Sequence, residues 1–595
     1  MAKISYILII VFSISLFNSC SNHWTGQPAE IKQSEYNGPK LKKSYGAYLA
    51  GRVAHLRKNF NAAADYYIEA LKEDPENREL LGRVYVILAS KGRISEAAKY
   101  AEISLKKGDK NNFTYIIMGV DKMKNGRFAE ANETISQLNG VVYKEFIIPL
   151  MSAWGYAGQN KPDQALKTLK IIEKEPSFRA LYHFHAGMIN DYFDRPDEAR
   201  RHYEIIVNEE SMEMSFRALQ VITNFYIRNG EKDKAIALSQ KYNDEKLLAD
   251  MLKKLAQNVK KADPAKTAKI VDNPNVGMSE ALFSIAATLR QGSAGVDLAH
   301  IFICLSIYSN PRYDLAKLLL ADILESREMY GEANDVYDEI DEESEAYYSA
   351  QVKKAGNLVM MQDYASAELL LKSLALENPD NYQLMLDLGD VLRIRNKQDE
   401  AITYYEDAIK KLPKIENQHW VLYYALGISY ESLDDWEKAE PAFKKALSLS
   451  QNHYLVQNYL GYSWLKRNLH VNEAFNLIVD AYNQAPNDGH ITDSLGWAFF
   501  KLGKYDQAIE YLEKASELEP ANALISDHLG DAYWFGGRKN EAEFQWKHAL
   551  IMEDDSGELN KKTVRKKIKY GLEAPLPLKY DPKLVEEKAM FIVQE

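Results

Sequence analysis

The sequence predicts an all-α solenoid built from about fourteen helix-turn-helix repeats. Three observations lead to this fold class. A pattern of small and aromatic residues recurs with a period of about 34 residues over most of the chain. Glycine and proline are sparse, at 30 and 18 of 595 residues, so long stretches can stay helical. The chain is also too long for one hydrophobic core, whereas stacked repeats extend a core along one axis.

The repeat is clearest near the C-terminus, where Ile491–Phe499 and Ile525–Tyr533 align. Each segment contains Leu-Gly followed by an aromatic residue three positions after the glycine. An alanine follows twelve residues after each glycine, at Ala508 and Ala542. Gly496 and Ala508 are small enough to let two helix backbones approach closely, and larger residues fill the space around that contact. The spacing therefore predicts pairs of tightly packed antiparallel helices.

The same frame extends upstream, with one residue inserted near His470. Each upstream unit is anchored by one alanine: Ala63, Ala97, Ala131, Ala165, Ala199, Ala235, Ala299, Ala333, Ala367, Ala401, Ala439 and Ala474. The matches are looser between the two ends, and the phase breaks at residues 243–278, where we predict a single helix, Glu245–Lys260, followed by a proline-containing joint.

This pattern is identified as that of tetratricopeptide repeat proteins, and the resemblance runs from Tyr45 to about Asp554. The resemblance implies a right-handed superhelix. We expect an N-terminal array at 44–242, a joint at 243–278 and a C-terminal array at 279–556. Residues 557–595 should form a polar capping helix and then an extended tail.

The first residues, Met1 to Cys20, predict a targeting signal. Lys3 precedes an apolar run from Tyr6 to Phe17, which is shorter than the ~20 residues that span a bilayer. The segment resembles a bacterial lipoprotein signal, so residues 1–19 would be removed and Cys20 lipidated. The alternatives are an ordinary secretory signal or an uncleaved anchor. Residues 20–43 are polar and contain glycine and proline, which predicts a flexible tether.

The cysteine is followed by Ser21. In enteric lipoproteins an aspartate at this position retains the protein in the inner membrane. The resemblance therefore favours the outer membrane, with the chain facing the periplasm of a bacterial envelope.

Composition excludes several protein classes. Hydrophobic residues make up 46% of the chain and charged residues 27%, which excludes wholesale disorder and a polytopic membrane protein. The net charge of −11 argues against a nucleic-acid-binding protein.

The family resemblance also implies where a partner would bind, in the concave groove lined by the first helix of each repeat. Aromatic rings with a few charges suit a peptide-binding surface. In the last four repeats the candidate groove residues are Tyr424, Asn458, Tyr462, Asp493, Trp497, Phe500, Lys501, Asp527, Asp531 and Trp534. The alternative is that the two tryptophans pack against neighbouring repeats and the aspartates are solvated.

We find no sequence motif for catalysis, a cofactor or a metal. HExxH, Walker, GxGxxG and GxSxG motifs are all absent. His183 and His185 should point to different faces of a first helix, as surface or groove residues rather than a metal pair. Cys304 lies in an apolar second helix and should be buried. The basic run Lys561–Lys569 is predicted to be a solvated helix face, or a surface for anionic lipid.

The sequence thus predicts a non-catalytic scaffold that binds other proteins or peptides and is held to the membrane by an N-terminal lipid. It would bind no nucleic acid, and it would assist envelope assembly or secretion. The alternative is an accessory subunit that positions a polysaccharide, peptidoglycan or secretion enzyme. A cryptic enzyme is a third hypothesis.

Overall fold

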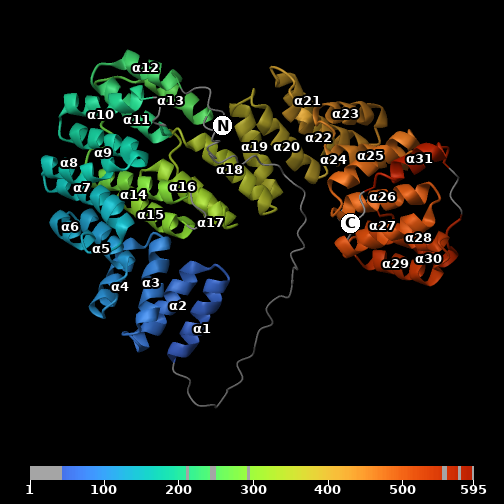
Figure 1. The fold of residues 1–595 in the computed structure, drawn as a ribbon, viewed down its shortest axis with the longest axis horizontal. Coiled ribbons are helices and arrows are strands. Elements are labelled where there is room, and N and C mark those ends of the chain that lie inside the picture. Colours follow the sequence, from blue (N-terminus) through green and yellow to red (C-terminus); the bar gives the residue numbers. More distant parts are fainter. Residues whose placement is uncertain are drawn as a thin grey trace. The chain divides into compact units, whose positions relative to one another are not determined.

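The computed structural model describes residues 43–209, 214–241, 249–290, 295–552, 559–573 and 578–592. All regular structure in these residues is helical (Figure 1). Cys20, the predicted signal and nearly all of the predicted tether lie outside the described residues. No helix in the described ranges is long and apolar enough to cross a bilayer.

The chain divides into two compact units, one up to residue 361 and one from residue 362. The predicted joint at 243–278 lies inside the first unit. The helices of the first unit are α1 (Lys43–Leu56), α2 (Phe60–Glu73), α3 (Arg78–Ser90), α4 (Ile94–Lys106), α5 (Asn112–Lys124), α6 (Phe128–Ile135), α7 (Ile148–Gly158), α8 (Pro162–Leu169), α9 (Arg179–Tyr192), α10 (Pro196–Asn208), α11 (Phe216–Arg228), α12 (Lys232–Lys241), α13 (Ala249–Lys261), α14 (Pro274–Arg290), α15 (Val296–Ser309), α16 (Asp314–Glu325), α17 (Tyr330–Asp338) and α18 (Tyr347–Met360).

The second unit continues the same architecture, with consecutive helices paired and stacked. Its helices are α19 (Tyr364–Glu377), α20 (Tyr382–Ile394), α21 (Gln398–Lys411), α22 (Trp420–Ser432), α23 (Trp436–Leu449), α24 (Tyr454–Lys466), α25 (Val471–Gln484), α26 (Gly489–Lys501), α27 (Tyr505–Leu518), α28 (Ala523–Phe535), α29 (Lys539–Ile551), α30 (Lys561–Tyr570) and α31 (Pro582–Ala589).

The predicted close contacts within each helix pair are confirmed. Every anchoring alanine that the repeat frame singled out is fully buried, from Ala63 to Ala542. A side chain on Gly496 would place its Cβ 2.6 Å from Cγ of Leu512, and one on Gly530 would lie 2.5 Å from the ring of Trp546. Small residues therefore recur because there is no room for larger ones at the helix crossings.

Local sequence sets the helix ends. Several first helices begin at side-chain caps, as where Asn522 accepts hydrogen bonds from the backbone N–H groups of Leu524 and Ile525. The turn between α26 and α27 needs a positive φ, which Gly503 adopts at 73°. The extra residue predicted near His470 lies in the turn between α24 and α25, where His470 has a φ of 44°.

Two predictions concern the segments outside the regular repeats. The helix predicted at Glu245–Lys260 is seen as α13, although residues 242–248 are not described. The tail predicted to be extended contains α31, so that prediction was wrong. Asp581 caps this helix and Pro582 occupies its first turn, where proline is favoured. The helix packs on α25, where the side chain of Asn483 donates to the Phe591 carbonyl at 2.9 Å.

Candidate functional site

Contacts between first helices of neighbouring pairs join α3 to α5 in the first unit, and α20 to α22, α24 to α26 and α26 to α28 in the second. We group the first helices of each unit into one layer. In the first unit this layer includes α3, α5, α7, α9 and α11. In the second unit it includes α20, α22, α24, α26 and α28. We call each of these a first-helix layer. The resemblance implies that a partner would bind on this layer.

In the first unit the first-helix layer is covered by another part of the same chain. Helix α14 packs against α7 and α9, and α15 packs against α3 and α5 (Figure 1). The contact is close, because a Cβ on Gly277 of α14 would lie 2.1 Å from the ring of Trp154 on α7. The hairpin formed by α14 and α15 therefore fills the surface that the repeat frame assigns to a ligand.

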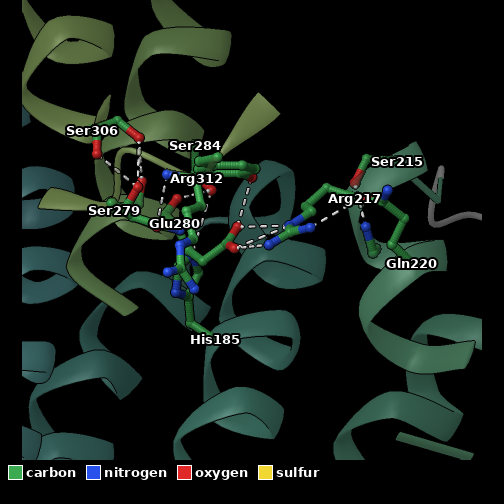
Figure 2. Close-up of polar contacts among 12 residues, drawn as sticks. His185, Ser215, Arg217, Gln220, Ser279, Glu280, Ser284, Ser306 and Arg312 are labelled. Atoms are coloured by element: carbon green, nitrogen blue, oxygen red, sulfur yellow. Dashed lines mark hydrogen bonds and ion pairs between the residues drawn. The ribbon is translucent and has the colours of Figure 1, made fainter. Parts of the chain in front are cut away.

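A buried ion pair holds α14 to α11 (Figure 2). The guanidinium of Arg217 donates Nε–H to both carboxylate oxygens of Glu280, at 3.0 and 3.1 Å, and Tyr313 donates its hydroxyl to the same carboxylate at 2.7 Å. Burial alone would lower the pKa of Arg217, but the Glu280 carboxylate outweighs that effect and raises it. The side chain of Glu280 is 1% exposed and that of Arg217 is 13% exposed, so this pair is largely shielded from water.

Uncharged hydrogen bonds also join α14 to α15 and to α9. Ser279 and Ser306 each donate a hydroxyl to the other's carbonyl oxygen, both at 2.8 Å (Figure 2). Nδ1 of His185 accepts the indole N–H of Trp154 at 3.1 Å, and its Nε2 lies 3.4 Å from the hydroxyl of Ser284 on α14. Burial lowers the pKa of His185 to about 3, so the ring is neutral.

His183 and His185 point to different faces of α9, as predicted, but neither is exposed on the surface. His183 turns away from His185 and places its Nδ1 2.9 Å from Nδ1 of His202. Both histidines are buried rather than on the surface, because α10 and α14 cover them. In the described ranges no group of three or more His, Cys, Asp or Glu residues is placed to hold a metal ion.

The second helix of the hairpin, α15, is buried around nearly its whole circumference, and Cys304 on it is buried as predicted. The Cys304 thiol donates to the carbonyl of Ser90 at 3.4 Å, and the Tyr308 hydroxyl donates to Asp121 at 2.9 Å. A cavity of about 660 Å³ remains beside α15, lined in part by Lys91 and Glu332, which pair with each other. Its lysines and carboxylates are equal in number, so the lining favours no ligand charge.

In the second unit, four of the predicted groove residues are buried and engaged within the chain. Both oxygens of Asp493 lie 3.0 Å from Nδ1 of His528. Lys567 on α30 reaches Asp527 at 2.8 Å and Asp531 at 2.7 Å. The fourth, Phe500, is buried among aromatic rings.

The alternative that the aspartates are solvated was therefore wrong, because His528 on α28 pairs with Asp493, and Lys567 on α30 pairs with Asp527 and Asp531. Burial raises the pKa of Asp531 to about 6, even with Lys567 beside it. The basic face of α30 was predicted to be solvated. Lys562, Arg565 and Lys566 are exposed, as predicted, but Lys567 is buried.

The two predicted tryptophans are half-buried and packed. The indole of Trp497 stacks on His528 of the next repeat, with ring centroids 4.0 Å apart. The indole N–H of Trp534 donates to the carbonyl of Leu572 at 3.1 Å, beyond the end of α30. The capping segment thus covers the last repeat of the first-helix layer.

The other predicted groove residues, Tyr424, Asn458, Tyr462 and Lys501, are partly exposed on α22, α24 and α26. Tyr424 contacts the ring of Tyr459 at 5.7 Å. Burial lowers the pKa of Lys501, and no carboxylate of the described residues lies within ion-pair distance of it. Tyr462, Trp497 and Lys501 therefore give the middle of this layer aromatic surface and one desolvated cation.

Comparison with known protein families agrees with this repeat geometry. Family models described as tetratricopeptide repeat match residues 354–414 and 420–453, and one described as TPR repeat matches 496–535. The chain is a tetratricopeptide repeat protein. Repeats of this kind generally mediate contacts between proteins.

Curated relatives share only part of their length with this tetratricopeptide repeat protein. A TPR repeat-containing protein of Pseudomonas aeruginosa is 26% identical over 219 residues, which is 37% of this chain and 36% of the relative. The peroxisomal targeting signal receptor of Saccharomyces cerevisiae is 25% identical over 216 residues, or 35% of each chain. The chain thus spans about a third of the length of these relatives.

Solved structures of the same repeat type are also similar. The Cut9–Hcn1 hetero-tetramer of the APC/C matches at 13% identity, covering 89% of this chain and 97% of that one, with a TM-score of 0.36. A tetratricopeptide repeat protein of Parabacteroides merdae matches at 15% identity, covering 49% and 97%, with a TM-score of 0.31.

Proposed function

We propose that this protein is a non-catalytic scaffold that binds a partner peptide on the first-helix layer of the second unit. One observation carries the proposal. The corresponding layer of the first unit is filled by α14 and α15, while α22, α24 and α26 keep aromatic rings and a lysine partly exposed. Half-buried aromatic residues supply contact area with little loss of side-chain freedom.

The chemistry of Lys501 indicates the charge of the partner. A cation that is partly desolvated and has no carboxylate beside it gains stability when one is supplied. Tyr462 and Trp497 offer rings on neighbouring helices. The proposed ligand is therefore a peptide segment that combines a carboxylate with apolar or aromatic side chains.

Capture of partners from an envelope extract tests this proposal. The full chain is compared with Lys501→Glu, and Lys547→Glu on α29 serves as a matched control because its side chain is 62% exposed on a second helix. We expect the first variant to lose the partner and the control to keep it. Equal capture by all three proteins would contradict the proposed surface.

We further propose that the protein is anchored by a lipid at Cys20 in the bacterial outer membrane and assists envelope assembly or secretion. The support is the sequence of residues 1–21. Palmitate labelling with membrane fractionation of wild type and Cys20→Ala tests this. Label and outer-membrane sedimentation should be lost together in the variant. If neither protein is labelled and both are soluble, the anchor proposal is wrong. An enzyme among the captured partners would favour the accessory-subunit alternative.

A further inference from the structure

The first helix of the chain presents an apolar stripe to solvent. Tyr45, Leu49, Val53 and Leu56 of α1 are 59%, 62%, 48% and 75% exposed. Their spacing of four, four and three residues places them on one helix face. The opposite face, with Gly51 and Ala54, packs on α2. Figure 1 shows α1 at the end of the first unit, beyond which no further described repeat covers it.

The charge around this stripe is unusual for the chain. Residues 36–64 contain six basic residues and no acidic one, although the protein as a whole carries a net charge of −11. The basic residues are Lys40, Lys42, Lys43, Arg52, Arg57 and Lys58. In the described part of the chain neither Arg52 nor Arg57 forms an ion pair with a carboxylate, and Arg52 donates only to the Tyr48 hydroxyl. These two arginines therefore have no carboxylate partner among the described residues.

We infer that α1 docks on an anionic phospholipid surface, with the apolar stripe at the boundary between headgroups and acyl chains. An interfacial helix combines an exposed apolar face with lysine and arginine at its flanks. A helix of 14 residues is about 21 Å long, enough to lie along a bilayer surface. A second copy that packed α1 against α1 would bring these basic residues together, whereas lipid phosphates would neutralise them.

The place of α1 in the chain supports the same occupant. Only 22 residues separate Cys20 from α1. A lipid at Cys20 would keep α1 near a bilayer. The inference goes beyond the proposed scaffold function and does not depend on lipidation, because the test below removes Cys20.

An environment-sensitive fluorophore on α1 tests the inference in the full chain. The label is attached at Leu49→Cys in a Cys20→Ser background. Burial raises the pKa of the Cys304 thiol to about 12, so that cysteine does not compete for the reagent. The matched control carries the label at Leu369→Cys, where leucine is 73% exposed on α19 of the second unit. Residues 1–19 are common to both proteins, so any attachment through them affects both alike.

With vesicles of phosphatidylcholine containing 30% phosphatidylglycerol, we expect a blue shift and quenching by brominated acyl chains at position 49 and neither at 369. Pure phosphatidylcholine or high salt should reduce the shift, because both weaken the attraction between charges. Arg57→Gln should weaken partitioning about five-fold.

Other occupants give different results, and each overturns the inference. A label at 49 shielded without vesicles, in proportion to protein concentration, would indicate a second copy. Shielding without vesicles at every concentration would indicate the chain's own N-terminal segment. A label that stays in water in all conditions would show that nothing docks on α1.

Discussion

Replacing Glu280 with glutamine should release the hairpin α14–α15 from the first-helix layer of the first unit. The Glu280 carboxylate is the counter-charge of Arg217, and its side chain is 1% exposed. Glutamine has a similar shape but leaves the Arg217 guanidinium buried without a negative partner. Breaking a buried ion pair in this way costs about 3–5 kcal/mol.

Hydrogen exchange of the amides in α14 and α15, followed by mass spectrometry, measures this effect locally. Since 1.4 kcal/mol corresponds to a factor of ten, exchange should be faster by about 100- to 4,000-fold. Glu69→Gln is the surface control, because the Glu69–Lys72 pair is exposed and screened by water, so its loss should change exchange little.

A compensated variant separates the charge effect from damage to packing. Replacing Arg217 with methionine, Glu280 with leucine and Tyr313 with phenylalanine removes the charges and the hydroxyl together. Apolar replacement of a whole buried pair is often neutral or stabilising, so slow exchange should return. The reasoning is refuted if Glu280→Gln changes exchange no more than Glu69→Gln does.

Three further predictions concern packing and pH. Ala508→Leu overpacks a helix crossing where the alanine is fully buried, and should destabilise the second unit by about 1–3 kcal/mol in urea unfolding, whereas unchanged stability would contradict the crossing. Gly277→Val drives a side chain into Trp154 and should speed exchange in α14 while leaving α26 unchanged. Burial alone would lower the pKa of His528, but Asp493 outweighs it and the pKa is raised. The pair therefore adds stability that is complete below pH 6.5 and is lost as pH rises through the folded pKa, so the difference in unfolding free energy between wild type and His528→Gln should shrink between pH 5 and 9.

The sequence predicted the helix pairs well because their determinants are local. Each pair needs small residues at fixed spacing, and the alanines at those positions are buried throughout. The filled layer of the first unit could not be found this way, because Arg217 and Glu280 lie 63 residues apart and meet only when the repeats stack. One local signal was present, since the run from His300 to Tyr308 is apolar around the whole helix, as expected of a helix buried on all sides.

The groove residues were predicted less well than the fold. The repeat pattern correctly placed Asp493 and Asp527 on first helices. A residue's position in the repeat does not show, however, whether a side chain from another helix already pairs with it. His528 and Lys567 occupy those carboxylates, and Lys567 comes from a capping helix outside the repeat period. Tyr462 and Lys501, on the same first-helix layer, remain partly exposed.

Site-specific photo-crosslinking in cells tests the central claim most directly. A photoreactive benzoylphenylalanine is placed at Tyr462 in the first-helix layer of the second unit, or at Phe544, which is 65% exposed on the second helix α29. The account predicts a discrete protein adduct from position 462 that disappears with Lys501→Glu, and none from position 544. Adducts from 544 with none from 462 would contradict it, because the partner would then bind the opposite face of the solenoid.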